Sequence, residues 1–526
     1  MSKRLLILLL FISIYAYNVK TAEAFYPEST FFAQNDNYFL HTIERGQTVY
    51  SIAAMYHVSV EDIYKLNPGS KEVIRAGDVL KIPQESGSFI YHTIQPKETL
   101  YGVSQKYGMK GEDIIAVNSG LSVETFNIGK IIRIPTNRVT SPLQGGNEVE
   151  NSNKTNSLLS KTGPVEAVNT IKIALLLPFS ETNSQNVARM VEYYEGFLLA
   201  LQEIKKQGIS VDLQVYDIGT GTKEINNILK KDKMQHIHLL IGGLSDEQIK
   251  LISRFSIEKN IPYVIPFTSK SDEPFNNPNV YQVNTPQPHL YSKASLAFIN
   301  KYKNDNIILV TQDVPAPNQL DFIKVLKEDL QDKKISYKTV NLDINFLSDL
   351  NTQLSKDKKN VIIPMDDSAE TLARLITPLK WMLESHPDLK VSLFGYLNWQ
   401  SHIAKFADSS EDFFLLNTSF YTVFYANPTY PDVKSFYNNF YKWYSRNLLN
   451  YFPKYGILGY DTGLYFIRLI HNYGTLFDSH VNDLRDNGIQ IDFQFQRVNN
   501  WGGFINTNLY IVDYNSDHTI TKSIIR

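Results

Sequence analysis

The order of hydrophobic and polar positions divides the chain into stretches that predict different structures. Residues 5–16 are almost wholly apolar, but about 12 residues are too few to span a bilayer as a helix. Between residues 38 and 136, short apolar runs alternate with positions at helical spacing. From residue 170 onwards, continuous apolar runs such as Ile171–Leu177 alternate with helical patterns, which predicts strands buried on both faces. The fold class is therefore predicted to be α/β.

The first 24 residues carry the pattern of an export signal. Lys3 and Arg4 precede the apolar run, and Ala22-Glu23-Ala24 follows as a small-x-small cleavage site. This order predicts a cleaved secretory signal over residues 1–24, with an uncleaved anchor as the alternative. No later stretch reaches the roughly 18 apolar residues of a membrane span. We therefore expect a secreted protein of the periplasm or cell wall, without a transmembrane segment after cleavage.

Residues 38–84 and 89–136 are two copies of one pattern. His41-Thr42-Ile43 recurs as His92-Thr93-Ile94, and the similarity continues to the end of each copy. Each copy predicts a strand, two helices and a closing strand in about 45 residues, which is a small βααβ unit. The residues predicted to cap the first helix of each copy are Thr48 and Thr99.

The two copies resemble the LysM module. In the first copy the resemblance lies in residues 45–53, Asn67-Pro68 and residues 76–83. Modules of this family bind glycans that contain N-acetylglucosamine, chiefly peptidoglycan or chitin. The second copy departs from the family at its first turn, where Pro96-Lys97-Glu98 replaces the usual Gly-Asp. The departure concerns glycan contact rather than fold.

The resemblance implies a sugar groove between the strand–helix turn and the turn before the last strand. Backbone amides and carbonyls would bond the N-acetyl group, and small apolar side chains would accept its methyl. Two modules on a short linker would raise avidity. The alternative for Val49, Leu100, Tyr50 and Tyr101 is a purely structural role in the core, which we favour for the tyrosines. The implied groove residues are Gly46, Gln47, Thr48, Val49, Ile74, Arg75 and Ala76 in the first copy, and Lys97, Glu98, Thr99, Leu100, Phe126, Asn127 and Ile128 in the second.

Residues 138–169 are predicted to be a flexible linker. The stretch contains no aromatic residue and is rich in Asn, Ser, Thr and Gly. A coil of this length spans roughly 30 Å on average. We therefore expect the domain that follows to move freely relative to the two modules.

Residues 170–526 predict a large domain with two α/β lobes. Strands and helices alternate up to residue 267, and the pattern restarts with a helix near Pro288. Two later helices without a strand between them, Asp432–Arg446 and Tyr460–His471, suggest that the chain crosses back. Residues Trp501–Val512 and His518–Ile524 predict a closing β-hairpin.

This order resembles the type I periplasmic binding-protein fold, which includes the branched-chain amino-acid receptors. In open α/β sheets, ligands lie beyond the carboxyl ends of the strands, and two facing lobes would form a cleft that closes by a hinge. The resemblance implies ligand contacts from Ser245, Thr268 and Ser269, with helix N-capping as the alternative for Ser245. The second lobe departs from the family at residues 312–317, where two prolines stiffen the turn. The segments that carry the resemblance are residues 173–178, 194–200, 240–245, 261–269 and 459–465.

Composition excludes several kinds of chemistry. The net charge is −2, from 52 basic and 54 acidic residues, so no basic excess favours a nucleic-acid partner. The absence of cysteine excludes disulfides, thiolate metal sites and a cysteine nucleophile. No common hydrolase, metalloprotease or phosphate-loop motif is present. We therefore expect no enzyme activity, no cofactor and no metal site.

The remaining candidates have ordinary explanations. His236 and His238 share a strand face without an evident carboxylate partner, so a packed or exposed pair is favoured over a metal site. Asp366-Asp367 is best explained by N-capping. Glu192 and Glu195 lie one helical turn apart, which predicts a solvated face. The aromatic residues that are dense between residues 420 and 466 are expected mainly to pack helices, with stacking on sugars or a protein as the alternative.

These features favour a non-catalytic envelope protein. Its modules would bind peptidoglycan, and its two-lobed domain would sense or capture a small ligand or a cell-wall synthase or hydrolase. A second hypothesis is the substrate-binding receptor of an ABC-type amino-acid transporter. A third is a peptidoglycan hydrolase or its regulator.

Overall fold

The computed structural model describes residues 38–44, 46–71, 74–84, 88–136, 159, 168–180, 184–312, 321–401, 409–484 and 488–525. The predicted export signal lies outside these residues. Of the predicted linker, only Leu159, Val168 and Asn169 are described. Leu159 is buried in the hydrophobic cluster of the second small unit, which a linker prediction does not anticipate.

The two repeats fold as two βααβ units, here named module 1 and module 2. In each, the first and last strands form a two-stranded antiparallel sheet. Thr48 accepts a hydrogen bond from the Ser51 amide at 3.0 Å, and Thr99 accepts one from the Gly102 amide at 3.1 Å, so both predicted N-caps are confirmed. The elements are β1 (Tyr38–Thr42), α2 (Val49–Tyr56), α3 (Val60–Leu66), η1 (Pro68–Lys71) and β2 (Val79–Pro83) in module 1, and β3 (Phe89–Thr93), α4 (Leu100–Tyr107), α5 (Gly111–Ala116) and β4 (Ile131–Pro135) in module 2.

Lobe 1 of the large domain is a parallel sheet with helices on both faces. Its strand order is β6-β5-β7-β8-β9, extended by β16 (Phe504–Asn506) and the edge strand β15 (Phe495–Arg497). This 2-1-3-4-5 order is one of the two common doubly wound arrangements. The elements are β5 (Thr170–Leu177), α7 (Ser184–Lys206), β6 (Ser210–Asp217), α8 (Lys223–Leu229), η2 (Asp232–His236), β7 (Leu239–Gly242), α9 (Asp246–Lys259), β8 (Tyr263–Ile265), η3 (Glu273–Phe275) and β9 (Val280–Gln282).

Lobe 2 repeats this arrangement. Its strand order is β11-β10-β12-β13-β14, followed by the antiparallel strands β17 and β18. The elements are α10 (Gln287–Tyr302), β10 (Asn306–Thr311), α11 (Asp321–Asp332), β11 (Tyr337–Asn341), α12 (Phe346–Gln353), β12 (Asn360–Pro364), α13 (Ala369–Ser385), β13 (Val391–Gly395), α15 (Ser409–Leu415), β14 (Ser419–Thr422), β17 (Leu509–Tyr514) and β18 (Ile520–Ile525).

The chain passes between the lobes at three points. It leaves lobe 1 after β9, returns after β14 into α16 (Pro431–Tyr444) and α17 (Tyr455–Tyr473), and crosses again between β16 and β17. The predicted fold class, two βααβ modules followed by a two-lobed α/β domain, is confirmed. The elements that complete the return to lobe 1 are η4 (Phe477–His480), β15 (Phe495–Arg497) and β16 (Phe504–Asn506).

One predicted element is wrong in detail. The run Trp501–Val512 is not one strand of a hairpin, because β16 pairs with β9 in lobe 1 whereas β17 pairs with β14 in lobe 2. Only Thr507 and Asn508 separate the two strands. The hairpin of β17 and β18 is confirmed. The short strands β9 and β14 were not predicted, because β9 directly follows the turn-forming residues Asn276-Asn277-Pro278-Asn279 and β14, with four residues, is too short to show a periodic pattern.

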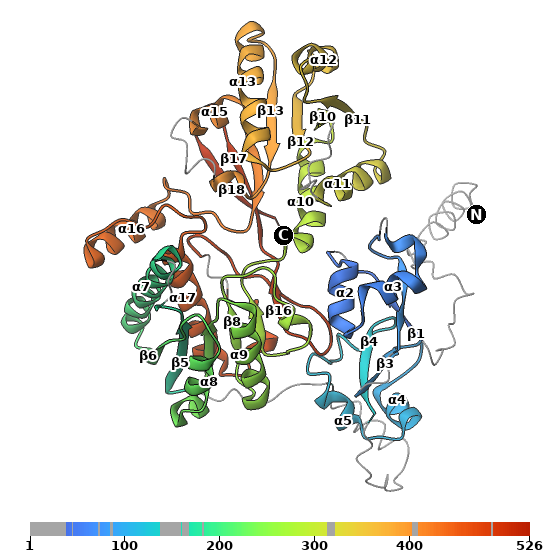
Figure 1. The fold of residues 1–526 in the computed structure, drawn as a ribbon, viewed down its shortest axis with the longest axis vertical. Helices are drawn as coiled ribbons and strands as arrows, with labels where there is room; N and C mark the ends of the chain where they lie inside the picture. The colour runs from blue at the N-terminus through green and yellow to red at the C-terminus, as the bar shows by residue number, and fades with distance from the viewer. Residues whose placement is uncertain are drawn as a thin grey trace, which may run out of the picture.

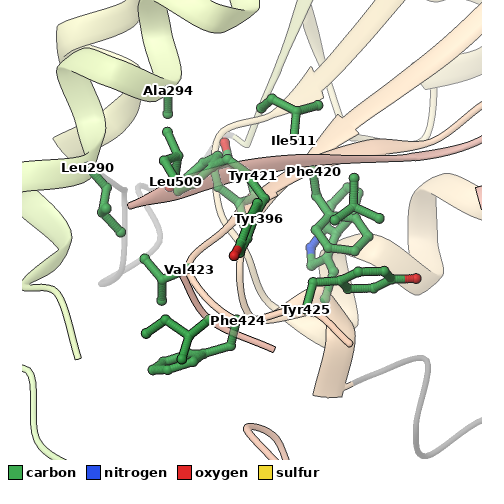
Figure 2. Close-up of a cluster of buried hydrophobic side chains, with 14 of the residues drawn as sticks. Leu290, Ala294, Tyr396, Phe420, Tyr421, Val423, Phe424, Tyr425, Leu509 and Ile511 are labelled. Atoms are coloured by element: carbon green, nitrogen blue, oxygen red, sulfur yellow. The ribbon is translucent and has the colours of Figure 1, made fainter. Parts of the chain in front are cut away.

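Figure 1 shows lobe 2 above, lobe 1 below it, and the two modules together at one side. The core of lobe 2 is rich in aromatic side chains where α10 packs against β14 and β17. Figure 2 shows Leu290 and Ala294 of α10 beside Tyr396, Tyr421 and Leu509. The same hydrophobic cluster continues into lobe 1, where it includes Ile171, Ile173 and Phe197, so the two lobes share a continuous core.

Candidate functional site

Hydrogen bonds from a histidine side chain stabilise the first turn of module 1, an arrangement named here the histidine brace. The Gln47 side-chain oxygen accepts a hydrogen bond from the Glu44 amide at 2.8 Å and lies 2.7 Å from His41 Nε2. His41 Nδ1 lies 2.8 Å from the Tyr56 hydroxyl. Because that oxygen is an acceptor, Nε2 donates to it and Nδ1 accepts from the hydroxyl. Burial lowers the pKa of His41, although Gln47 opposes the shift, so the neutral imidazole that this pattern needs is favoured.

Module 2 repeats the brace with a glutamate. Glu98 accepts from the Gln95 amide at 2.8 Å and pairs with His92 Nε2 at 2.7 Å. His92 Nδ1 lies 3.1 Å from the Tyr107 hydroxyl, and burial lowers the pKa of His92 while Glu98 opposes the shift. The substitution in the family pattern therefore keeps the shape of the turn.

The backbone at this turn is also alike in both modules. Gly46 has φ +85° and Lys97 has φ +68°, so a lysine occupies the left-handed region where the family resemblance leads one to expect glycine. Sequence reasoning missed His41 and His92, although their recurrence in the repeat was a usable signal.

An asparagine that recurs in both modules ties the second helix of each module to its last strand. Asn118 donates to the carbonyls of Ile114 and Arg133, both at 2.7 Å, and accepts from the Arg133 amide at 2.8 Å. Asn67 makes the equivalent three bonds in module 1. These bonds hold the segment that forms the other edge of the predicted groove.

The predicted groove residues differ in exposure between the modules. Val49 and Leu100 are buried in the hydrophobic clusters of their modules. In module 2, Lys97, Thr99, Asn127 and Ile128 are all exposed, and Ile128 is 58% exposed. In module 1, the equivalent first-turn residues Gly46, Gln47 and Thr48 are half-buried, as is Ile74, whereas Arg75 and Ala76 are exposed.

The half-burial in module 1 comes from the large domain. A Cβ atom placed on Gly46 would lie 2.7 Å from His289 Cα, at the start of α10. On the opposite edge of the groove, Arg75 lies 3.9 Å from Glu328 of α11. Tyr50 is 64% exposed and donates to Asp272 at 3.1 Å, so it is not the core residue that we favoured from sequence.

A single tryptophan of lobe 1 lies between the two modules. Trp501, in the turn between β15 and β16, is 2% exposed and belongs to the hydrophobic cluster of module 1. Its ring lies 5.9 Å from that of Tyr56 in module 1 and 5.6 Å from that of Tyr91 in module 2. The guanidinium of Arg133 lies 4.5 Å from its centre, which is a cation–π distance.

Hydrogen bonds complete this contact. Asn500 donates to the Ile131 carbonyl at 3.0 Å, and its own carbonyl accepts from the Gly120 amide at 2.7 Å. Arg133 donates to Asn276 at 2.8 Å, and Asn276 donates to the Ala54 carbonyl at 3.2 Å. The modules are thus packed on the large domain, which differs from the free movement that the linker predicted.

The predicted cleft residues lie at the carboxyl ends of neighbouring strands. Ser245 follows β7 and caps α9, where its hydroxyl accepts from the Gln248 amide at 3.3 Å. Thr268 follows β8 and accepts from the Lys270 amide at 3.0 Å. Ser269 is half-buried beside it. The N-cap alternative therefore describes Ser245 as the structure has it.

Polar groups at the facing end of lobe 2 are likewise bonded to one another. Asp366 accepts from Gln312 and Thr371, both at 2.7 Å, and from the Ser368 amide at 2.8 Å. Ser368, rather than either aspartate, is the N-cap of α13. Asp367 accepts from Asn398. The paired aspartates brace this end of the sheet.

The predicted solvated face of Glu192 and Glu195 is wrong. Glu192 is 1% exposed and accepts from the Leu449 and Gly456 amides at 2.5 and 3.2 Å. Arg446 pairs with both glutamates, and burial raises the pKa of Glu192. The segment after α16 folds over α7, which local sequence does not reveal.

A polar cavity of about 620 Å³ lies beside this segment, between α7, α16 and α17. Asp461 of α17 lies on its wall and accepts from three backbone amides at 2.8–3.1 Å. Burial raises the pKa of Asp461 to about 7 against the effect of these bonds, which indicates a structural carboxyl that holds residues 489–491. Of the aromatic residues on α16, Phe436 and Phe440 pack inward while Tyr441 and Trp443 are exposed.

Among the described residues, no group of three or more His, Asp or Glu side chains is arranged to hold a metal ion. His238 accepts from the Lys172 amide at 3.2 Å. In the same part of the chain, no helix combines the length and apolar character needed to cross a membrane.

The comparison with protein families identifies both modules. The LysM domain model matches residues 41–83 and 92–135, so the chain carries two LysM domains. Among curated proteins, the chain is 28% identical over 90 residues to "Probable autolysin SsaALP" of Staphylococcus aureus, which is 15% of this chain and 34% of that protein. It is 29% identical over 105 residues to "Autolysin" of Enterococcus faecalis, which is 18% of this chain and 14% of that protein. The matched regions thus cover between 14% and 34% of the relatives' own length.

Solved structures resemble the large domain. A branched-chain amino-acid ABC transporter periplasmic ligand-binding protein from Burkholderia xenovorans aligns with 68% of this chain and 94% of its own, at 11% identity and a TM-score of 0.46. The branched-chain amino-acid substrate-binding protein of Streptococcus pneumoniae, in complex with isoleucine, aligns with 68% of this chain and 99% of its own, at 14% identity and a TM-score of 0.39. The strand order of the two lobes, and not these similarities, defines the fold described above.

Proposed function

We propose that this protein is a non-catalytic component of the cell envelope that attaches to peptidoglycan through its LysM domains and holds a two-lobed binding domain beside the wall. The observation that carries the proposal is the pair of LysM domains with intact, histidine-braced first turns. LysM-containing autolysins among its relatives support an extracytoplasmic location. The export pattern in residues 1–24 supports it as well.

The two-lobed domain is proposed to capture a protein of the cell wall, such as a synthase or hydrolase. The polar side chains at the facing strand ends support this assignment over an amino-acid ligand. Ser245, Thr268 and Asp366 each bond to groups of their own lobe. A small ligand would have to replace these bonds, and each bond lost to a poorly matched partner costs affinity.

A small-ligand receptor, as in amino-acid transport, is the second candidate. The observation in its favour is the doubly wound order of both lobes and the triple crossing between them. This architecture supports hinge closure around a ligand. Ser245, Thr268 and Ser269 remain the residues proposed to contact such a ligand.

Sedimentation tests the attachment. Purified protein lacking residues 1–24 should pellet with insoluble peptidoglycan and remain in solution without it. Incubation with peptidoglycan should release no soluble fragments. A protein that stays in the supernatant contradicts attachment, and released sugars or peptides contradict the absence of catalysis.

A thermal-shift screen separates the two candidates for the large domain. Any ligand that binds only the folded state raises the melting temperature by mass action. We expect no shift with single amino acids. A reproducible increase with one of them, lost in the Thr268→Ala variant, would replace the protein-capture proposal with the small-ligand candidate.

A further inference from the structure

We infer that module 2 alone supplies the glycan site of the intact protein, and that the groove of module 1 is the surface on which its own large domain docks. The inference rests on the proposed peptidoglycan attachment and assigns it to one of two similar modules. It reverses the expectation from sequence, in which module 2 departs from the family pattern at Pro96-Lys97-Glu98.

The first step is that a glycan cannot reach the first turn of module 1. The backbone of Gly46 lies against His289, and no Cβ atom would fit between them. Glu44 and Gln47 line two small spaces, of about 30 and 180 Å³, and the lobe 1 residues Arg497 and Val498 line both of them. Neither space is lined by Gly46, so a sugar that contacts the backbone there would have to displace the large domain.

The second step is that the large domain also reaches the opposite edge and end of the groove. Arg75 faces Glu328 of α11 at 3.9 Å. Tyr50, in the first turn of α2, donates to Asp272. The contacts come from both lobes, because Asp272 belongs to lobe 1 and Glu328 to lobe 2. Figure 1 shows module 1 between module 2 and the lobe 2 helices α10 and α11.

The third step is that the same region of module 2 is open. Lys97 and Thr99 on one edge and Asn127 and Ile128 on the other are exposed. They remain so although Leu159 packs on the hydrophobic cluster of this module. The contacts of module 2 with the large domain lie elsewhere, at Gly120, Ile131 and Arg133.

The fourth step is that module 2 retains the geometry needed to bind. Its first turn has the brace of module 1, with Glu98 in place of Gln47. Lys97 adopts the left-handed conformation that Gly46 adopts. The departure from the family pattern is therefore a change of side chains on an unchanged backbone, which leaves backbone amides and carbonyls available for an N-acetyl group.

Equivalent substitutions in the two modules test the inference. Ala76 and Ile128 occupy the same position in the repeat, and both are exposed, so Ala76→Lys and Ile128→Lys should both fold. Binding of a soluble, uncharged oligomer of N-acetylglucosamine to the mature chain is measured by isothermal titration calorimetry. Glu112→Lys, on the exposed surface of α5, is the control for an added lysine.

We expect one oligomer bound per wild-type chain. Ile128→Lys should weaken binding at least tenfold, whereas Ala76→Lys and the control should stay within about twofold of wild type. A stoichiometry of two, a loss with Ala76→Lys, or full binding by Ile128→Lys would each overturn the inference. Failure of the wild-type chain both to bind the oligomer and to pellet with peptidoglycan would instead overturn the proposed function beneath it.

Discussion

Modules 1 and 2 share one fold and differ in what surrounds them. Both have the same antiparallel strand pair, the same capping threonine and the same histidine brace. Yet the first turn of module 1 faces His289 of the large domain, while that of module 2 faces solvent. The difference teaches that two copies of one fold can present different surfaces, because the rest of the chain can cover one copy and leave the other open.

The largest expected effect comes from removing the tryptophan between the modules. Trp501→Ala deletes a buried side chain that contacts Tyr56, Tyr91 and Arg133, and such deletions cost about 3–5 kcal/mol. Thermal unfolding should show a lower melting temperature, and calorimetry should show a second glycan site as module 1 becomes accessible.

Trp443→Ala is the matched control. Trp443 is exposed on α16, and surface substitutions usually change stability by less than about 0.5 kcal/mol. If Trp501→Ala leaves both stability and glycan stoichiometry at wild-type values, the comparison between a covered and an open module fails.

The asparagine ties should differ in strength between the modules. Asn118 is fully buried, whereas Asn67 is half-buried. The backbone groups that lose their partner in Asn118→Ala are therefore less accessible to water than those in Asn67→Ala. We expect a loss of about 2–3 kcal/mol for Asn118→Ala and about 1 kcal/mol for Asn67→Ala. Chemical denaturation of the two variants measures both, and a larger loss for Asn67→Ala would contradict the burial difference.

Acid should weaken the contact at module 1. Burial lowers the pKa of His289 from its ordinary value of 6.5 to about 4, with Glu44 and Arg497 beside it in the same small space. The separated state therefore takes up a proton first as the pH falls through 6.5 towards 4, and the packed state loses stability over that range. Above pH 6.5 His289 contributes no pH dependence.

The measurement compares wild type with His289→Gln, which cannot titrate. Between pH 7.5 and pH 5.5, His289 alone should shift the equilibrium between the packed and the separated state about tenfold towards the separated state. The variant should lack this part of the pH dependence. Contributions from His41 and His92 are the same in both proteins and cancel in the difference. Equal slopes for both proteins would show that His289 is not held neutral by the contact.

The smallest effect is expected at the edge of the groove. Glu328→Gln removes the partner of Arg75, whose side chain is largely exposed, and pairs of this kind contribute about 0–1 kcal/mol. The change in melting temperature should be near the error of the measurement and should vanish at high salt. A loss comparable to that of Trp501→Ala would mean that lobe 2, rather than lobe 1, holds module 1 in place.

Local sequence predicted those parts of the molecule that depend on local interactions. Thr48 and Thr99 cap helices because a hydroxyl three residues before an amide can do so in any context. The apolar run at Ile171–Leu177 became a central strand because its neighbours on both faces are apolar too. Periodicity and repetition carry this information directly.

The rest depends on residues far apart in the chain. Trp501 lies in a turn whose sequence, Asn499-Asn500-Trp501-Gly502-Gly503, predicts a loop and not its partner. The break between β16 and β17 comes from pairing with strands of different lobes. Glu192 is buried by a segment more than 250 positions later, so its helix alone predicts exposure. The groove of module 1 was predicted from residues of the module itself, whereas the large domain that covers it could not be predicted from them.

The seating of Trp501 between the modules has a mechanical consequence. A pull from the wall on module 2 first meets the packed surface at Asn500 and Trp501, in parallel with the covalent chain through residues 137–167. Force would reach the turn between β15 and β16. From there it would reach the two-residue connection, Thr507 and Asn508, that leads from β16 into β17 of lobe 2. With the proposed attachment to the wall, tension in the envelope would reach lobe 1 through Trp501 together with the hydrogen bonds of Asn500 and Asn276.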